Sequence, residues 1–273
     1  MDEPLALRDE LRIALRIAAL RIRGQMAYRA SFWMQIFSSF IVHLAELIAL
    51  LAMFTRFEAM GGWTLGEVAL LHGISMTAFS IADTIAVGLD SVPAQVRHGE
   101  FDRVLTRPLS SWIQTIVSEV SLRHLGLLPQ GIVMLGVSIA LVDVRWTPGK
   151  ALFLPIVIAS GVGLYVALFT VMAILSFWTV NAVEAVNAFT YGGRNLGQFP
   201  LHIFDRWLRR VFIWIVPVGF TAYFPALYLL DKRDPLGMPG FFPFIGPAVA
   251  ALFCLVVAWG WRLGIRHYRS TGS

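Results

Sequence analysis

Six apolar segments, each long enough to cross a lipid bilayer as a helix, restrict the folds open to this chain more than any motif does. They lie at about 32–55, 64–90, 112–142, 150–180, 207–230 and 243–262. A helix rises about 1.5 Å per residue, so about twenty residues cover a hydrocarbon core of about 30 Å. A charged fraction of 14% and a mean hydropathy of +0.70 are far from those of a water-soluble domain. We therefore expect an all-α, polytopic integral membrane protein with six transmembrane helices, in a single domain over 1–273.

Two of these segments carry signals of their own. Thr64 and Glu67 form a T-x-x-E capping box, which predicts the N-terminus of the second helix. Pro217 and Pro225 interrupt the fifth segment, and the carbonyl groups that they free need neighbouring helices or a cavity. This segment is therefore predicted to be kinked or partly re-entrant. The polar, glycine-containing stretch 181–206 before it is interpreted as an inner loop.

Residues 1–29 are expected to contain an amphipathic helix at the cytoplasmic membrane surface. Small and aliphatic residues share one helical face over 4–23, and arginines share another. These arginines are Arg8, Arg12, Arg16 and Arg23. The pattern is typical of a helix that lies along lipid headgroups. Because this helix leads directly into a membrane span, membrane lipid is a better partner for its arginines than nucleic acid.

The distribution of Lys and Arg orients the chain. If all six segments cross, sixteen of the 22 basic residues fall on the side of the termini and five on the other. Arg123, at the start of the third segment, accounts for the remaining one. Basic residues favour the cytoplasmic side of a membrane. Both termini are therefore predicted to be cytoplasmic.

A compact charged segment, 93–110, separates the second and third apolar segments. Its charged residues are Arg97, Glu100, Asp102, Arg103 and Arg107. Its apolar residues are Val96, Phe101, Val104 and Leu105. Gly99 and Pro108 divide it into one or two helical turns. A solvated loop would explain the charges alone, but charged and apolar residues together favour a docking site for a soluble partner.

Sequence motifs for catalysis are absent. The chain has no GxxxxGK[ST] phosphate loop, no HExxH zinc helix and no GxSxG nucleophile elbow. Its one cysteine, Cys254, permits neither an internal disulfide nor a Cys-based metal site. We expect a non-catalytic chain without a cofactor or metal of its own, so any ATP that drives it must bind another chain.

Polar side chains form a stripe on each of the first two spans. On the first span they are Gln35, Ser39, His43 and Glu46. On the second, the stripe contains His72, Ser75, Met76, Phe79, Asp83 and Asp90. An ionisable group in hydrocarbon is costly and normally faces a partner or a wet cavity. The stripes therefore either line a translocation path or pair with each other, within the chain or across a dimer, and the frequency of helix-packing contacts favours pairing.

Several pieces of the sequence resemble, in order and spacing, one six-span branch of the type-2 ABC exporter permeases. They are YRASFW at 28–33, GEFDRVLTRPLS at 99–110, VPVGFTAYFPALYLL at 216–230 and GIRHYRSTGS at 264–273. The most specific pattern is Gly-x-x-Asp-x-x-Leu-x-Arg-Pro, which stands at Gly99, Asp102, Leu105, Arg107 and Pro108. The resemblance covers essentially the whole chain.

This resemblance implies the permease subunit of an ATP-driven exporter in the plasma (inner) membrane of a bacterium. A second six-span permease, identical or related, would complete the substrate path, and separate ABC ATPase subunits would bind ATP and Mg²⁺. The loop 91–111 would carry the coupling helix that fits a groove on the ATPase. Its contact residues would be Val96, Arg97, Glu100, Phe101, Asp102, Arg103, Leu105 and Arg107.

Two other classes of protein remain open. An ion-gradient-driven secondary transporter or channel would use His43, Glu46 and Asp83 and would need no ATPase. An intramembrane enzyme would need a nucleophile and a base at a usable spacing, and none recurs in the sequence.

Overall fold

The computed structural model describes residues 7–26, 29–119, 128–142, 144–179 and 183–269, and every regular element within these ranges is a helix. The longer helices are α1 (Leu7–Met26), α2 (Arg29–Phe54), α3 (Leu65–Ala86), α7 (Leu128–Leu141), α8 (Pro148–Leu175), α9 (Val183–Gly197) and α12 (Gly246–His267). The shorter helices are η1 (Val87–Ser91), α4 (Val92–Arg97), α5 (Asp102–Leu105), α6 (Ser111–Ser118), η4 (Leu201–Ile203), α10 (Arg206–Arg210), η5 (Val211–Ile215), η6 (Val218–Phe220), α11 (Tyr223–Leu229) and η7 (Phe242–Phe244).

Four helical segments of the described chain are long and apolar enough to cross a membrane: Trp33–Phe54, Leu65–Arg97, Pro148–Leu175 and Gly246–His267. A fifth candidate is the pair Arg206–Ile215 and Val218–Leu229, which is bent by 75°. The predicted third span, 112–142, falls on α6 and the short apolar helix α7, and 120–127 lie outside the described residues. The prediction of an all-α polytopic membrane protein is confirmed, whereas the count of six spans stays a prediction.

Helix α3 lies inside the bundle, and most of its side chains are buried. It packs against α7, α8 and α9. Two glycines allow α3 and α7 to approach closely. A Cβ on Gly73 would lie 2.7 Å from the backbone nitrogen of Leu135, and one on Gly131 would lie 2.7 Å from that of Thr77. Small residues at such crossings let helix backbones come together in a membrane, where packing drives helix association.

Contacts between distant parts of the sequence define two ends of the bundle. At the loop end, Phe101 of the charged segment packs against Phe177, just after α8, with ring centroids 5.1 Å apart. At the turn end, His202 Nε2 lies 2.7 Å from the carbonyl oxygen of Gly61, between α2 and α3. The chain between Phe177 and His202 therefore passes from one end to the other, and it contains α9.

The prediction that 181–206 forms an inner loop is therefore wrong. Helix α9 occupies most of this stretch, and it packs against α3 and α8. Glycines and polar residues lowered the apparent membrane affinity of the stretch, although buried helices tolerate both where neighbouring helices supply partners.

Segment 206–229 does not cross the bundle, because both of its flanks lie at the turn end. His202 before it contacts the carbonyl oxygen of Gly61, and Lys232 after it donates a hydrogen bond of 3.0 Å to that of Gly62. The crossing predicted at 207–230 is thus contradicted, and the re-entrant form expected from its prolines fits. Pro217 follows η5 directly and cannot donate the backbone hydrogen bond that would continue the helix.

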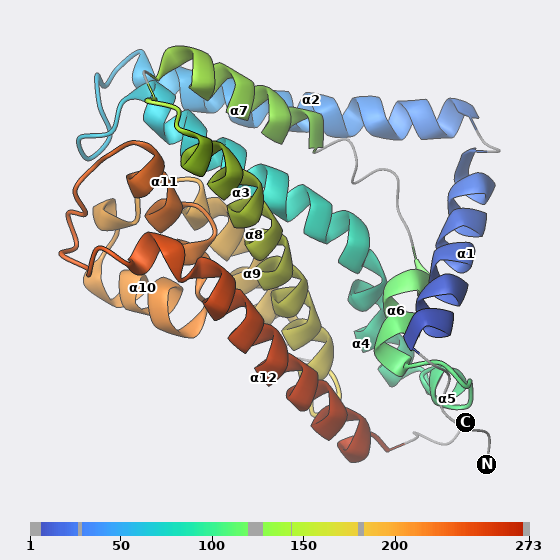
Figure 1. Cartoon of the computed structure of the whole chain (residues 1–273). Helices are drawn as coiled ribbons and strands as arrows, with labels where there is room; N and C mark the ends of the chain where they lie inside the picture. Colours follow the sequence, from blue (N-terminus) through green and yellow to red (C-terminus); the bar gives the residue numbers. More distant parts are fainter. Residues whose placement is uncertain (1–6, 27–28, 120–127, 143, 180–182, 270–273) are drawn as a thin grey trace.

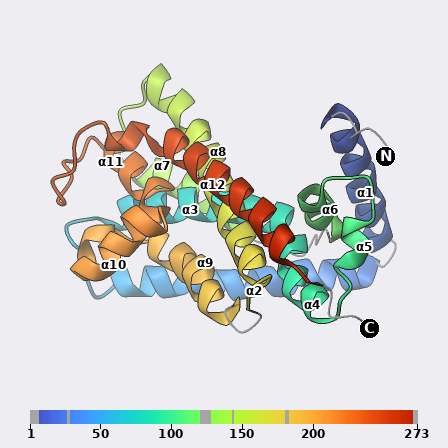
Figure 2. The ribbon, with the colours of Figure 1, turned by 90° about the horizontal axis from the view of Figure 1, so that it is seen from below.

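Figures 1 and 2 agree that α10 and α11 lie opposite α1, α4, α5 and the C-terminal end of α12. Arg206, Arg209 and Arg210 therefore lie toward the turn end, although the sequence count assigned them to the side of the termini. The excess of basic residues at the loop end is correspondingly smaller. The cytoplasmic location of the termini stays a prediction.

The predicted amphipathic helix is present as α1, at the loop end (Figure 1). Its arginines Arg8, Arg12 and Arg16 are exposed. On its other side α1 packs against α6, and Glu10 Oε1 accepts a hydrogen bond of 2.9 Å from the backbone N–H of Ser110. This contact attaches α1 to the end of the charged segment.

Candidate functional site

The charged segment is built from two short helices, α4 and α5, joined by a tight turn. Gly99 in this turn has φ of +69°, a left-handed conformation that other L-residues rarely adopt. The backbone N–H groups of Glu100 and Phe101 both donate to the carbonyl oxygen of Gln95, at 2.9 and 3.3 Å. The glycine of the GEFDRVLTRPLS motif therefore fixes how α5 folds back on α4.

Phe101 anchors the segment to the bundle. Its side chain is fully buried, and its ring lies 5.1 Å from Phe177, 5.4 Å from Tyr268 and 6.3 Å from Trp261 between centroids. Val96 is also buried, at 8% exposure. Their apolar side chains fold inward against this chain, and the prediction that Val96 and Phe101 contact an ATPase stays a prediction.

The other predicted contact residues surround this anchor at the surface. Five of them are exposed: Arg97, Glu100, Arg103, Leu105 and Arg107. Asp102 is half-buried and faces Tyr268. Burial raises the pKa of the Tyr268 hydroxyl, and the neighbouring Asp102 carboxylate raises it further. Asp102 therefore also belongs to the anchor, while the exposed five offer mixed charge and one apolar side chain to a partner.

Gln114 fastens the segment to α6. Its Nε2 donates to the carbonyl oxygens of Leu109, at 2.7 Å, and Val104, at 3.0 Å. The side chain is 6% exposed, and these two bonds satisfy its buried Nε2 group. Sequence reasoning missed Gln114, since nothing in the pattern distinguishes a structural glutamine at the start of an apolar helix.

Two indole groups then join α6 to the membrane helices. Trp112 Nε1 donates to Thr170 Oγ1 on α8 at 3.2 Å, and Trp261 Nε1 of α12 donates to Ser111 Oγ at 3.1 Å. With the Phe101 contacts, these bonds place the charged segment, α6, α8 and α12 in one connected unit. A force on the segment can therefore reach the bundle through direct contacts.

The polar stripe of α2 meets a partner that sequence reasoning missed. Glu46 Oε1 accepts a hydrogen bond of 3.0 Å from Arg194 on α9, and the Arg194 guanidinium lies 5.2 Å from the ring centre of Phe79. Gln35 is exposed, and the side chains of Ser39 and His43 lie outside the described residues. The sequence did not indicate Arg194 as a partner of Glu46, because the stretch 181–206 was interpreted as a loop.

The stripe of α3 faces the packed interior. His72 and Asp83 are 2% and 3% exposed. At ~1.5 Å per residue they lie about 17 Å apart along the helix, too far to form one site. Between them, the hydroxyls of Ser75 and Tyr165 lie 3.0 Å apart. Where the structure describes the chain, no three His, Cys, Asp or Glu side chains gather as metal ligands.

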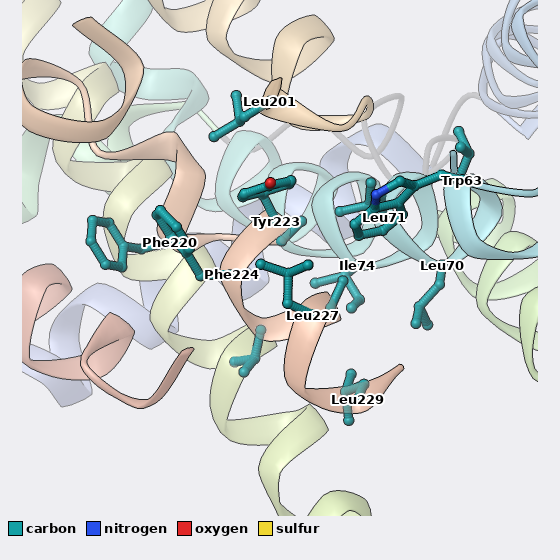
Figure 3. Close-up of a cluster of buried hydrophobic side chains, with 14 of the residues drawn as sticks. Trp63, Leu70, Leu71, Ile74, Leu201, Phe220, Tyr223, Phe224, Leu227 and Leu229 are labelled. Atoms are coloured by element: carbon teal, nitrogen blue, oxygen red, sulfur yellow. The ribbon is translucent and has the colours of Figure 1, made fainter. Parts of the chain in front are cut away.

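An aromatic cluster organises the turn end (Figure 3). Trp63 stacks on Tyr223 with ring centroids 5.9 Å apart, and both side chains are buried. The Tyr223 hydroxyl donates to Asp234 Oδ1 at 3.0 Å and lies 3.4 Å from His202 Nδ1. These contacts join the α2–α3 turn, η4, α11 and the loop after α11.

An ion pair closes the same end. Lys232 Nζ donates to Glu67 Oε2 at 2.6 Å, and Glu67 Oε2 also accepts from the Thr64 backbone N–H at 2.7 Å. The predicted capping interaction of Thr64 and Glu67 is thus present at the start of α3. One carboxylate holds both the helix terminus and the chain that follows α11.

Comparison with protein-family models places this chain in a family. The model of the ABC-2 family transporter protein matches residues 40–272, which is most of the chain. No curated protein and no solved structure matches it.

Proposed function

The chain belongs to the ABC-2 family of transporters, and on that premise we propose that it is the permease subunit of an ATP-driven exporter. Members of this family are membrane components of transport systems and generally do not catalyse hydrolysis. Separate ATPase subunits would bind ATP and Mg²⁺ and would dock on the charged segment. The termini and this segment would face the cytoplasm of a bacterial cell, across its plasma (inner) membrane.

The observation that carries this proposal is that the charged segment has a buried apolar side and an exposed charged side. Phe101 and Val96 are buried in the bundle, while Arg97, Glu100 and Arg103 remain in water. A loop that was only solvated would not need a fully buried aromatic anchor. A charged surface that is anchored in this way can transmit the movement of a docked partner, because the segment is packed against the bundle and moves with it.

The load would reach the bundle along the contacts already described. Helix α3 continues through η1 into α4, so Leu65–Arg97 forms one helical segment from the turn end to the docking surface. Glu10 passes motion to α1 and hence toward α2, and Phe101 passes it to α8 and α12. Closure of the ATPase pair would tilt these helices relative to each other and open the path outward.

A second permease subunit would cover α2, of whose candidate span only 7% is buried. Lipid could cover an apolar face, but the side chain of Glu46 is 34% exposed and its partner Arg194 is 13% exposed. Charged groups are costly next to hydrocarbon and normally face protein or a wet cavity. The pair therefore supports a protein neighbour at this face, and with it a dimeric path.

The same pair bears on the ion-gradient alternative. Glu46 has a cation within the chain, which suits a role in holding helices together. A proton-driven cycle through Glu46 would require this ion pair to break at each turnover. Transport that persists without any ATPase and stops with a protonophore would favour that alternative.

The test is a charge reversal at the docking surface. The full chain is reconstituted in lipid nanodiscs with candidate ABC ATPase subunits from the same cell, and complex formation and ATP hydrolysis are measured. We expect the triple variant Arg97→Glu, Arg103→Glu, Arg107→Glu to lose both. Arg233→Glu, an exposed reversal at the turn end, should change neither. Unaltered binding in the triple variant would remove the basis of the proposal.

A further inference from the structure

A groove of about 840 Å³ runs between α8 and α12 and is closed at the loop end by α6. It has the size of pockets that hold drug-sized ligands. Four of the residues that line it are Gly or Ala, namely Gly163, Ala167, Ala251 and Ala258, and most of the others are apolar. A Cβ on Gly163 would meet only Cys254 Sγ, at 3.8 Å, so the space is open rather than filled by a neighbour.

The groove lies along two helices that are long and apolar enough to cross a membrane. Leu255 and Ala258 line it and are exposed, so its mouth faces the surroundings of the bundle and not the core. At the depth of a membrane span those surroundings are lipid or another protein. An apolar trough of this kind fits a hydrocarbon chain.

One end of the groove is charged. Arg262 lines it and is exposed, beside Ser110 and Ser111. The residues that line the groove include no Asp or Glu, and Arg262 makes no ion pair within the described part of the chain. The cation is therefore available to an anionic group that enters with an apolar chain.

The length of the groove suits one leaflet of a bilayer. From Ala251 to Arg262, α12 rises about 17 Å at ~1.5 Å per residue. Half of a hydrocarbon core is about 15 Å. A lipid whose phosphate contacts Arg262 would therefore extend one acyl chain as far as Ala251.

We propose that this groove binds an anionic phospholipid, with the phosphate on Arg262 and one acyl chain between α8 and α12. Basic pockets between membrane helices recognise anionic headgroups in this way. The site is separate from the docking surface for an ATPase and holds whether or not the chain exports a substrate. A lipid here would fill the space between α8 and α12 and brace α6 against them.

Photo-crosslinking tests the site in the full chain. The protein is reconstituted in nanodiscs with phosphatidylglycerol or phosphatidylcholine that carries a diazirine in the middle of one acyl chain. Label on the groove peptides of α8 and α12 is divided by label on the exposed apolar face of α7, at Ile132 and Val133, which reports ordinary surrounding lipid. We expect this ratio to be roughly fivefold higher for phosphatidylglycerol, as one arginine contributes about 1 kcal/mol near an anionic headgroup.

Two pairs of variants separate the site from a general basic surface. Arg262→Gln should abolish the fivefold preference, whereas Arg266→Gln, one turn further on and outside the groove, should preserve it. Ala258→Leu should fill the groove and reduce labelling by both lipids. Ala248→Leu, an exposed position of α12 outside the groove, should not.

A second measurement uses the wild-type protein, so its result does not depend on whether a variant folds. Cys254 is the single cysteine of the chain and lines the groove, so its alkylation by N-ethylmaleimide reads the occupancy of the wild-type site. Phosphatidylglycerol should slow alkylation relative to phosphatidylcholine. Equal rates and equal labelling with the two lipids would mean surrounding lipid only. Cross-links from α12 to a second copy would assign the groove to a dimer contact, and either result overturns the proposal.

Discussion

The carboxylate of Glu46 on α2 and the guanidinium of Arg194 on α9 lie 3.0 Å apart, across 148 positions of sequence. This pair explains how a helix with so little buried surface as α2 is held in register with the rest of the bundle. Of the polar residues that the sequence places on α2, Glu46 therefore pairs within the chain.

Neutralising one partner of this pair should destabilise the protein more than neutralising both. Glu46→Gln leaves Arg194 without its counter-charge, and we expect a loss of about 1 kcal/mol in the free energy of unfolding, as for other polar contacts between membrane helices. The double variant Glu46→Gln, Arg194→Gln should recover part of this loss. Thermal unfolding followed by tryptophan fluorescence in detergent measures both, and additive losses would show that the two residues are not coupled.

The anchor and the surface of the charged segment should respond differently to truncation. Phe101→Ala removes a fully buried ring, and we expect a loss of about 3–5 kcal/mol of stability. Leu105→Ala removes a side chain that is 41% exposed and should leave the unfolding temperature nearly unchanged. If Leu105 belongs to the docking surface, its variant should nevertheless weaken ATPase binding in a pull-down. A thermally unchanged Phe101→Ala variant would show that the ring is no anchor.

Removing the side-chain amide of Gln114 should uncouple the charged segment from α6. Gln114→Leu keeps the volume but leaves the carbonyl oxygens of Val104 and Leu109 without their donor, at a cost of about 1–3 kcal/mol. We expect the ATPase still to bind, because the exposed arginines remain, while transport per ATP hydrolysed falls. Thr106→Val, an exposed change in the same segment, serves as the control. Full coupling in Gln114→Leu would contradict this assignment.

The close crossing of α3 and α7 should be sensitive to a single methyl group. Gly131→Ala would bring its Cβ within 2.7 Å of the Thr77 backbone nitrogen, and we expect a loss of about 1–3 kcal/mol from overpacking. Gly136→Ala, on the same helix, meets nothing within 4 Å and should be neutral or slightly stabilising. Unfolding temperatures of the two variants in the same detergent decide the matter.

Local sequence signals predicted what depends on local physics. Hydropathy identified α2, α8 and α12, and the Thr64–Glu67 pattern marked the start of α3. Each signal acts within one or two helical turns, so no tertiary contact is needed to interpret it.

The direction of a chain segment through the bundle was not predictable in this way. The course of α9 through the bundle follows from the contacts of Arg194 with Glu46 and of His202 with Gly61, and neither partner is near in sequence. The burial of Phe101 likewise depends on Phe177, Trp261 and Tyr268. Such contacts are long-range, and a single sequence without an alignment does not reveal them.

The aromatic seat of Phe101 sets an order of events during biosynthesis. Two of its three ring neighbours, Trp261 and Tyr268, follow it by 160 and 167 positions in the sequence. The charged segment, 93–110, leaves the ribosome well before them, yet it cannot reach its final conformation until α12 has been inserted. An ATPase that recognises the finished segment would therefore assemble only on chains that extend past Tyr268, and chains terminated before α12 would not bind it.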